Sequence, residues 1–337
     1  MTQSEMPVHV QMMNLASAKF ISKPLWVAAQ LGIADLIAQG VKSTDELARR
    51  TGTHARSLYR ILRALACVGV FTETAPRQFD LTPLASTLKT DAPNSMRDAV
   101  IFLNHPVHDI AWTEILHSVK TGLPGFDRAY GMPAFEYFQK NPEISEIFNR
   151  AMTNLARNDI SAVVDSYDFG GISKLVDVGG GHGVLMTSIL DRNPGMRGVV
   201  FDLPHVIDGT RKSLEASGHS SRCEAVGGDF FASVPGGDAI IMSHIIHDWD
   251  DERCITILRN TAKALPRNGK VLICEAVIRP GNEFSPAKLL DLEMLVVAGG
   301  MERTADEYSA LLKQAGFRLA RIVPTRNPVS VIEGVPI

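Results

Sequence analysis

Apolar residues recur every three or four positions along the first half of the chain, which predicts a mainly helical part up to about residue 165. One such pattern runs from Phe20 to Leu31, and another runs from Leu58 to Ala66. Further helices are expected at about 92–119, 133–139, 143–155 and 156–165.

Two short strands follow the first group of helices. Residues 43–46 have the hydroxyl and acidic residues that are typical of a helix start, and the next helix is expected to end at Gly69. Residues 70–72 and 78–81 then form two β-rich runs around a turn. Helix, turn, helix and two-stranded wing, in this order, predict a winged helix.

The pattern changes after residues 170–171, where short apolar runs alternate with helical stretches. The runs are Lys174–Val178, Gly198–Asp202, Cys223–Val226, Asp238–Met242 and Lys270–Cys274, and a closing hairpin is expected from Phe317–Val323 and Val329–Ile332. This alternation predicts a doubly wound, Rossmann-like α/β domain with a mainly parallel sheet. One core rarely extends beyond about 250–300 residues, so we expect two domains, 1–168 and 169–337.

Composition then narrows the class of protein. Hydrophobic residues make up 45% and charged residues 21%, as in ordinary globular proteins, and the net charge of −3 gives no overall basic surface for nucleic acid. No apolar run reaches the ~18–20 residues of a membrane span, and the N-terminal segment has no signal-peptide pattern. The four cysteines, Cys67, Cys223, Cys254 and Cys274, include no CxxC pair, which favours free thiols and a cytoplasmic location.

A glycine cluster joins a predicted strand to a predicted helix in Leu175-Val-Asp-Val-Gly-Gly-Gly-His-Gly-Val-Leu185. Glycines permit a sharp turn and the close approach of a cofactor. Gly179, Gly181 and Gly183 give G-x-G-x-G, whereas a dinucleotide site would have glycine in place of Val184. Taken alone, this motif is a weak signal that a tight turn also explains.

Acidic residues at the ends of the next two strands strengthen the signal. Asp202 follows the loop by about 20 residues, where a carboxylate can hold both ribose hydroxyls of a nucleoside. Asp229 ends the third strand, where it can meet an adenine edge. Each alone is an ordinary strand-end residue, but their combination with the glycine loop favours an adenosine pocket.

A histidine segment, Ser243-His-Ile-Ile-His-Asp-Trp-Asp-Asp-Glu252, follows the fourth strand. His247 is placed to take a proton from a weakly acidic hydroxyl, and Glu275 and Glu302 are the carboxylates available to orient it. A capping or packing role is the alternative for His247, and it is the preferred interpretation for His244. Residues 250–252 are expected to open a helix. The spacing predicts no metal site.

Seven motifs carry a family resemblance: LVDVGGGHG, FDLPHVI, GGDFF, SHIIHDWDDERC, LICEAVI, DLEML and GGMERT. In their order and spacing the chain resembles class I S-adenosylmethionine-dependent O-methyltransferases of the caffeic-acid/hydroxyindole type, including a microbial branch that modifies secondary metabolites. FDRAYGMPAFEYF and EIFNRAM match the middle segment of this family, so the resemblance covers nearly the whole chain. It implies a helical dimerisation domain with a winged-helix core, followed by a methyltransferase domain.

The resemblance also implies S-adenosylmethionine as cofactor, and it assigns roles to individual residues. His247 matches the catalytic base, flanked by Glu275 and Glu302. The positions that match cofactor contacts are Asp177, Gly179, Gly180, Gly181, Gly183, Asp202, Leu203, Gly228, Asp229, Phe230 and Ser243, the last standing where plant members often carry a lysine. Those that match the substrate cavity are Leu103, Asn104, Trp112, Phe148, Met152, His247, Asp248 and Met294.

The implied activity is methyl transfer to a hydroxyl, phenolic in the favoured case, of an aromatic or polyketide-like small molecule. A homodimer through the N-terminal helices is expected, with no nucleic-acid or membrane partner; a purely intramolecular core is the alternative for their apolar residues. Three other functions remain open: a repurposed S-adenosylmethionine-binding enzyme, a dinucleotide oxidoreductase, and a DNA-binding regulator that uses Arg56, Arg60 and Arg63 on one helix face.

Overall fold

A computed structural model of the chain describes residues 6–337. Residues 1–5, which the sequence analysis included in the helical domain, lie outside the described part. The described residues form two compact units. One contains the chain up to Ile110 together with Phe138–Ala156, and the other contains Ala111–Tyr137 and Arg157–Ile337. The division into domains after residue 168 stays a prediction.

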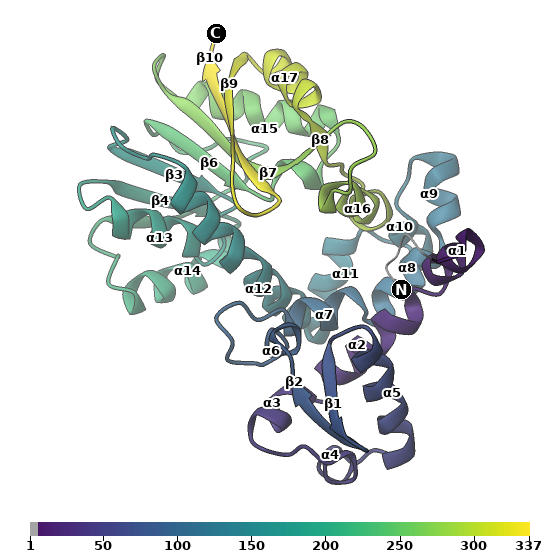
Figure 1. Cartoon of the computed structure of the whole chain (residues 1–337). Coiled ribbons are helices and arrows are strands. Elements are labelled where there is room, and N and C mark those ends of the chain that lie inside the picture. Colours follow the sequence, from purple (N-terminus) through teal and green to yellow (C-terminus); the bar gives the residue numbers. More distant parts are fainter. Residues whose placement is uncertain (1–5) are drawn as a thin grey trace. The chain divides into compact units, whose positions relative to one another are not determined.

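The N-terminal unit is mainly helical, as predicted (Figure 1). Its elements are α1 (Val8–Ala16), α2 (Lys19–Gln30), α3 (Ile33–Ala38), α4 (Thr44–Thr51), α5 (Ala55–Cys67), β1 (Phe71–Ala75), β2 (Gln78–Leu81), α6 (Pro83–Ser86) and α7 (Arg97–Leu103). Strands β1 and β2 pair antiparallel, which confirms the wing. Leu47, Leu62 and Phe79 are fully buried in the core of this unit, since α4, α5 and the wing turn their apolar faces toward one another.

Three helices run from one unit into the other: α8 (Pro106–Thr113), α11 (Ala134–Lys140) and α12 (Pro142–Ser166). The prediction of a single helix over 92–119 is wrong. The helical path is interrupted before Pro106, because proline disfavours helical geometry in the residue that precedes it. Two helices were expected over 143–165, but the structure has a single helix there, α12, since no glycine or proline interrupts that stretch.

The C-terminal unit is built on one mixed sheet (Figure 1). Its strands are β3 (Lys174–Val178), β4 (Arg197–Asp202), β5 (Cys223–Gly227), β6 (Ala239–Ser243), β7 (Lys270–Ile278), β8 (Arg303–Thr304), β9 (Phe317–Pro324) and β10 (Val329–Pro336). Its helices are α9 (Ile115–Thr121), α10 (Gly125–Tyr130), α13 (Val184–Arg192), α14 (Pro204–Ala216), η2 (Ile246–Asp248), α15 (Asp251–Ala264), α16 (Pro286–Glu293), η3 (Met294–Ala298) and α17 (Ala305–Gln314).

The strand order is β5-β4-β3-β6-β7-β10-β9. Strands β3 to β7 are parallel, and β9 and β10 form the antiparallel hairpin that the sequence predicts. Strand β8 was missed because two residues show no periodicity; it pairs with the end of β7. The order reverses between β3 and β6, and open α/β sheets bind ligands in the crevice beyond the carboxyl ends of strands at such a point.

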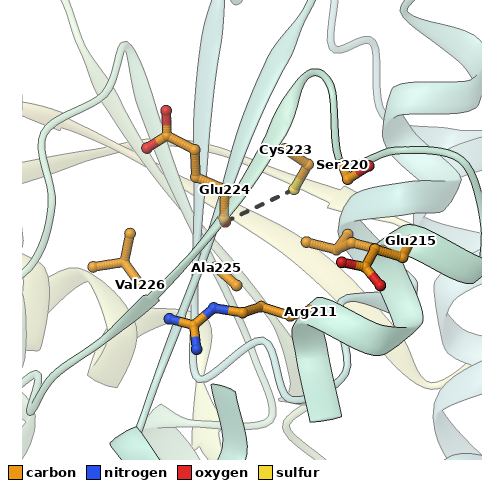
Figure 2. Close-up of a pocket in the computed structure, with 8 residues that line it drawn as sticks. Arg211, Glu215, Ser220, Cys223, Glu224, Ala225 and Val226 are labelled. Carbon is orange, nitrogen blue, oxygen red and sulfur yellow. Dashed lines mark hydrogen bonds between the residues drawn. The ribbon is translucent and has the colours of Figure 1, made fainter. Parts of the chain in front are cut away.

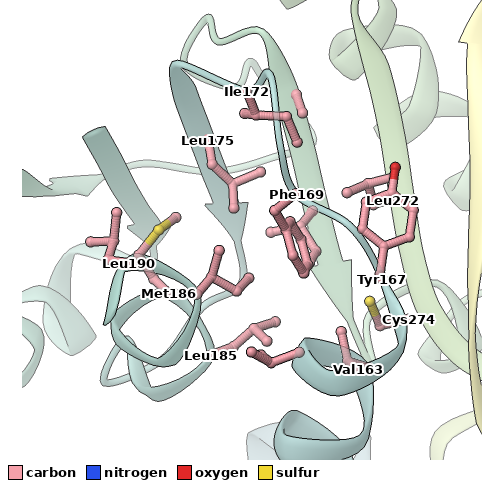
Figure 3. Packing of buried hydrophobic residues seen from close by; sticks show 14 of the residues in the cluster. Val163, Tyr167, Phe169, Ile172, Leu175, Leu185, Met186, Leu190, Leu272 and Cys274 are labelled. Atoms are coloured by element: carbon pink, nitrogen blue, oxygen red, sulfur yellow. The ribbon is translucent and has the colours of Figure 1, made fainter. Parts of the chain in front are cut away.

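Helices cover both faces of the sheet, which explains why its central strands are almost uninterrupted apolar runs. Side chains alternate between the two faces: Leu175 packs with α12 and α13 on one face, and Val176 packs with α15 and α17 on the other. Figure 3 shows the first of these clusters, in which Leu175, Leu185 and Val163 fill the space between β3, α13 and the end of α12. This two-sided packing fixes the strand ends that carry the candidate site.

Candidate active site

The loop after β3 needs its glycines. Gly179, Gly181 and Gly183 have φ of 71°, 55° and 79°, values that L side chains rarely adopt. A Cβ atom at Gly179 would lie 2.3 Å from Ile245, and one at Gly180 would lie 2.6 Å from the Asp177 carboxylate. The loop therefore follows a path that requires glycine at these positions, and it leads directly into α13.

Two carboxylates lie beside this loop. Asp202 accepts hydrogen bonds from the N–H groups of Gly181 at 2.8 Å and of Leu203 at 2.7 Å. Asp177 is buried, and its Oδ2 atom has no hydrogen-bond partner among the described residues. Burial, together with the nearby charge of Asp202, raises the pKa of Asp177 to about 7. A buried polar atom without a partner is uncommon in a folded protein and suggests that a ligand supplies one.

The segment after β5 brings a third acid to the same edge of the sheet. Asp229 accepts a hydrogen bond from the N–H of Phe231 at 2.8 Å, and its side chain is exposed. A Cβ atom at Gly228 would lie 2.4 Å from the Phe201 ring, so this position also requires glycine. The half-buried ring of Phe230 follows Asp229, and Ser243 ends β6.

The predicted base lies in the short 3₁₀ helix η2, after β6. His247 is 7% exposed, and its Nδ1 atom lies 2.7 Å from Oε1 of the buried Glu302. Because a carboxylate only accepts, Nδ1 carries the proton and donates it. When the ring is neutral, Nε2 is the nitrogen that can accept a proton, and Oδ1 of Asp248 lies 3.6 Å from it.

Glu275 takes a different place from the one expected of a carboxylate flanking the ring. Its Oε1 atom accepts hydrogen bonds from the backbone N–H groups of Ile245, Ile246 and His247, at 3.1, 2.6 and 3.2 Å. Its Oε2 atom accepts one from the hydroxyl of Tyr308 at 2.7 Å. Glu275 therefore holds the backbone of the segment that carries His247, and among the described residues Glu302 alone is hydrogen-bonded to the ring.

Electrostatics make His247 a strong proton acceptor. Burial lowers its pKa, but the carboxylates of Asp248, Glu302 and Glu275 outweigh burial and raise the pKa to about 10. Burial also raises the pKa of Asp248 to about 6, against the opposing effect of His247. The imidazole thus holds a proton far more tightly than an exposed histidine, which has a pKa of about 6.5.

The predicted substrate-binding residues are divided between the two units. Trp112 and Met294 belong to the C-terminal unit, where Nε1 of Trp112 donates to Glu293 at 2.8 Å and Met294 begins the π-helical turn η3. The members in the N-terminal unit are Leu103, Asn104, Phe148 and Met152. Their assignment to one cavity stays a prediction.

The other sequence interpretations can be placed in the structure as well. His244 lies 3.1 Å from Asp159 and has a positive φ of 55°, which is uncommon for a residue other than glycine. Asp250 caps α15 by accepting from the N–H of Arg253, as expected for the acidic helix start. The four cysteines form no disulfide among residues 6–337.

Three residues that the sequence pattern did not single out contact the groups that hold His247. Arg303 and Tyr308 contact the segment that carries His247 or the carboxylate beneath it, and Asp291 accepts a hydrogen bond from the N–H of Glu302 at 2.9 Å. Adjacency to Glu302 in the GGMERT motif was a signal for Arg303. Nothing in the sequence pattern distinguished Tyr308 from an ordinary core residue.

Two hollows lie away from these residues. Figure 2 shows one between α14 and the edge strand β5, lined by Arg211, Glu215 and Cys223 among others, and it contains none of the predicted site residues. The other lies on α5, where Arg56, Arg60 and Arg63 share one exposed side, as predicted.

Residues 6–337 lack two further features. They contain no group of three or more His, Cys, Asp or Glu side chains arranged to hold a metal ion. No helix within this part of the chain is both long enough and apolar enough to span a bilayer.

Comparison with known proteins gives the family. Residues 112–318, more than half of the chain, match the model of an O-methyltransferase domain, and residues 13–91 match that of an O-methyltransferase dimerisation domain. A phenazine O-methyltransferase of Lysobacter antibioticus is 43% identical over 98% of this chain and 97% of its own length. A mitomycin biosynthesis 6-O-methyltransferase of Streptomyces lavendulae is 36% identical, over 93% and 90%.

Solved structures agree with these matches. The crystal structure of LaPhzM has a TM-score of 0.91 and 43% identity, covering 98% of this chain and all of its own. An O-methyltransferase from neocarzinostatin biosynthesis, solved with S-adenosylmethionine and 2-hydroxy-5-methyl naphthoic acid, has a TM-score of 0.80 and 32% identity, covering 94% and 96%. Sequence and fold together place this chain in the O-methyltransferase family.

Proposed function

We propose that the chain transfers a methyl group from S-adenosylmethionine to a phenolic hydroxyl of an aromatic or polyketide-like small molecule, with His247 as the general base. The observation that carries this proposal is the buried hydrogen bond between His247 and Glu302. It fixes which nitrogen holds the proton and leaves Nε2 to accept one from a hydroxyl.

The residues at the strand ends fit the cofactor. The backbone of Gly179, Gly180 and Gly181 is partly exposed, and Oδ2 of Asp177, which has no hydrogen-bond partner among residues 6–337, suits the amino group of a methionine moiety. We assign Asp202 to the ribose hydroxyls, and Asp229 with Phe230 to the adenine. The remaining proposed contacts are Gly179, Gly180, Gly181, Gly183, Leu203, Gly228 and Ser243. When bound, S-adenosylmethionine supplies a methyl group activated by a positively charged sulfonium.

The chain's own part in the reaction is to orient the acceptor and move its proton. Glu302 holds the ring through Nδ1, and its negative charge stabilises the imidazolium that forms when Nε2 takes the proton. The pKa of His247, about 10, is close to the ~10 of a phenol, so the proton transfer is nearly balanced. A base positioned in this way typically contributes ~10²–10⁴-fold to the rate.

The acceptor class rests on the relatives and on the predicted cavity lining. Relatives include enzymes named for phenazine, mitomycin and 3-amino-4-hydroxybenzoate. We propose that apolar and methionine side chains hold a planar aromatic acceptor here, since methionine adapts to varied shapes. The proposed lining is Leu103, Asn104, Trp112, Phe148, Met152, Asp248 and Met294.

We also propose a homodimer through the N-terminal domain, 1–168, with the cofactor domain at 169–337, a cytoplasmic location and no nucleic-acid partner. The match of residues 13–91 to a dimerisation domain supports the dimer. Helix α1 supports it too, because Val8, Met12 and Leu15 share one face and are 80%, 65% and 72% exposed.

Calorimetric titration with S-adenosylhomocysteine, beside NAD as control, tests the cofactor. We expect micromolar binding of S-adenosylhomocysteine alone, and weaker binding by Asp202→Ala. Caffeic acid, 3-amino-4-hydroxybenzoate and 1,4-dihydroxy-2-naphthoic acid then serve as acceptors, with the gain of one methyl mass as readout. Binding without methylation of any phenol would favour a repurposed enzyme, and binding of NAD alone would refute the proposal.

A further inference from the structure

The segment that carries His247 has little regular structure of its own. It leaves β6 through His244, in the left-handed region, and makes a single turn of 3₁₀ helix over Ile246–Asp248 before α15. A segment outside long helices and strands has few repeating backbone hydrogen bonds, so other groups must satisfy and fix its buried N–H and C=O groups.

The N–H side of the segment is held by a buried pair. Glu275 accepts three of its backbone N–H groups through one oxygen, and Tyr308 donates to the other oxygen. Both side chains are fully buried, with no exposed surface. A buried carboxylate that lost its hydroxyl donor would be only partly satisfied, and it would hold the N–H groups less firmly.

The carbonyl side is held by a buried guanidinium. Arg303 is 1% exposed and donates to the carbonyl oxygens of Ile246 at 3.2 Å and Trp249 at 3.0 Å. It also donates to Asp251, at the start of α15, at 2.8 Å. The planar guanidinium reaches all three at once, which an ammonium group at the end of a lysine side chain does not.

The strip of chain from Gly300 to Arg303 joins this clamp to the ring of His247. The N–H of Met301 donates to the carbonyl oxygen of His247 at 2.9 Å, and Glu302 in the same strip is hydrogen-bonded to its ring. Movement of the strip or of the segment would therefore separate the ring from Glu302.

We infer that Tyr308 and Arg303 are positioning residues for His247, clamping its segment from the N–H side and the carbonyl side so that Nε2 stays in the reactive place. This inference rests on the proposed function, in which His247 is the base. A displacement of about 1 Å can lower a rate by about 100-fold, so a loosened clamp lowers kcat without touching the substrate.

The charged groups that face the ring give a readout that is independent of activity. They are Asp248 and His244 on the same loop, Glu275 from β7 and Glu302 before β8. Contact with Glu302 helps to hold the pKa of His247 high, so a ring that moves away loses its proton at lower pH. Destabilisation of the protein without such movement would leave this titration unchanged.

The test uses Tyr308→Phe and Arg303→Lys with two matched controls from the same unit. Tyr167 is a second buried tyrosine that donates to a glutamate, Glu333, also at 2.7 Å. Arg222 is a second arginine that donates to several backbone carbonyls, among them that of Leu190 at 2.9 Å. Tyr167→Phe and Arg222→Lys therefore delete the same kinds of contact away from His247.

Histidine ring nitrogens are labelled with ¹⁵N and titrated by NMR, and the His247 signal is identified by its loss in His247→Ala. We expect Tyr308→Phe and Arg303→Lys to move this titration to lower pH and, with whichever phenol the enzyme methylates, to lower kcat by about 10–100-fold at little changed KM. The controls should match the wild type.

The inference would be overturned if Tyr308→Phe and Arg303→Lys both had the same His247 titration and the same kcat as the control variants. Failure of the proposed function gives a different result: His247→Ala would then keep the wild-type kcat, while the NMR titration would still decide whether the two residues position the ring.

Discussion

At the residue scale, the chemistry depends on which groups are buried together. His247 and His219 are both buried histidines that lie beside a carboxylate, and His219 is 2.9 Å from Asp191. Of these two, His247 lies just beyond the carboxyl end of β6 in the middle of the sheet, and a second carboxylate, Glu275, holds its backbone. Position in the fold, more than residue type, separates a candidate base from a structural histidine.

Replacing His247 by alanine should lower kcat by about 10²–10⁴-fold, because the acceptor proton loses its receiver. The affinity for S-adenosylhomocysteine should stay near the wild-type value, since no cofactor contact is removed. His219→Ala is the control, and it should retain the wild-type kcat. Steady-state kinetics and calorimetry measure both quantities; equal turnover in His247→Ala would remove the general-base assignment.

The pH profile of kcat/KM should rise well into the alkaline range. The base acts only when unprotonated, and the carboxylates around His247 raise its pKa to about 10, so the active fraction grows as the pH approaches that value. Acceptors with phenols of different acidity separate the two possible sources of this rise. A limb that follows the pKa of each acceptor would contradict the assignment to His247.

Asp177 should make the folded protein less stable as the pH rises. Its folded pKa of about 7 exceeds the ordinary 3.8, so the stabilisation from its bound proton is complete in acid and is lost through about pH 7. Asp177→Asn should therefore gain about 1–4 kcal/mol in unfolding free energy relative to the wild type between pH 4 and pH 8. Urea unfolding without cofactor measures this, with exposed Asp208→Asn as control. A difference in unfolding free energy between Asp177→Asn and the wild type that stays the same from pH 4 to pH 8 would refute this prediction.

At the element scale, packing between short segments decides the geometry of the site. Gly300 has no room for a side chain, since a Cβ atom there would lie 2.0 Å from the carbonyl oxygen of His247. The π-helical turn η3 ends just before it, at Ala298. Backbone therefore lies directly against backbone where the strip before β8 meets the 3₁₀ turn.

Gly300→Ala should push these two segments apart and lower kcat by about 10-fold or more, with a lower melting temperature. Binding of S-adenosylhomocysteine should be little changed, because the glycine loop after β3 is untouched. Gly195 faces open space, so Gly195→Ala should match the wild type in both measurements. Wild-type turnover in Gly300→Ala would show that the strip can yield without moving His247.

At the scale of the whole molecule, the exposed apolar face of α1 predicts self-association. We expect sedimentation to give one species near twice the chain mass of 36.7 kDa at micromolar protein. Met12→Glu combined with Leu15→Glu should shift it toward 36.7 kDa, because charges would replace apolar contact. Phe284→Glu, at an exposed aromatic residue in the other unit, should leave the mass unchanged. A monomeric wild type would refute the dimer.

Much of the fold follows from local pattern. The β-rich runs matched β3 to β7 within a few residues, because strands buried on both faces consist almost entirely of apolar residues. The wing was equally visible from two short runs around a turn. The predicted element boundaries were wrong where something other than hydrophobic periodicity decides the structure. Pro106 divided a predicted helix, and β8 was too short to show a pattern.

Local sequence pattern is enough to propose the residues of the candidate site: the glycine loop, the acids at the strand ends, His247 and the two glutamates. The contacts of each glutamate follow from the fold, because Glu275 and Glu302 are both simply acidic residues in the sequence. Burial and the direction of the backbone place Glu302 on the ring and Glu275 on the peptide N–H groups, with Tyr308 behind it. Contacts between residues 30 to 60 positions apart depend on how strands and turns pack, and local pattern does not encode that.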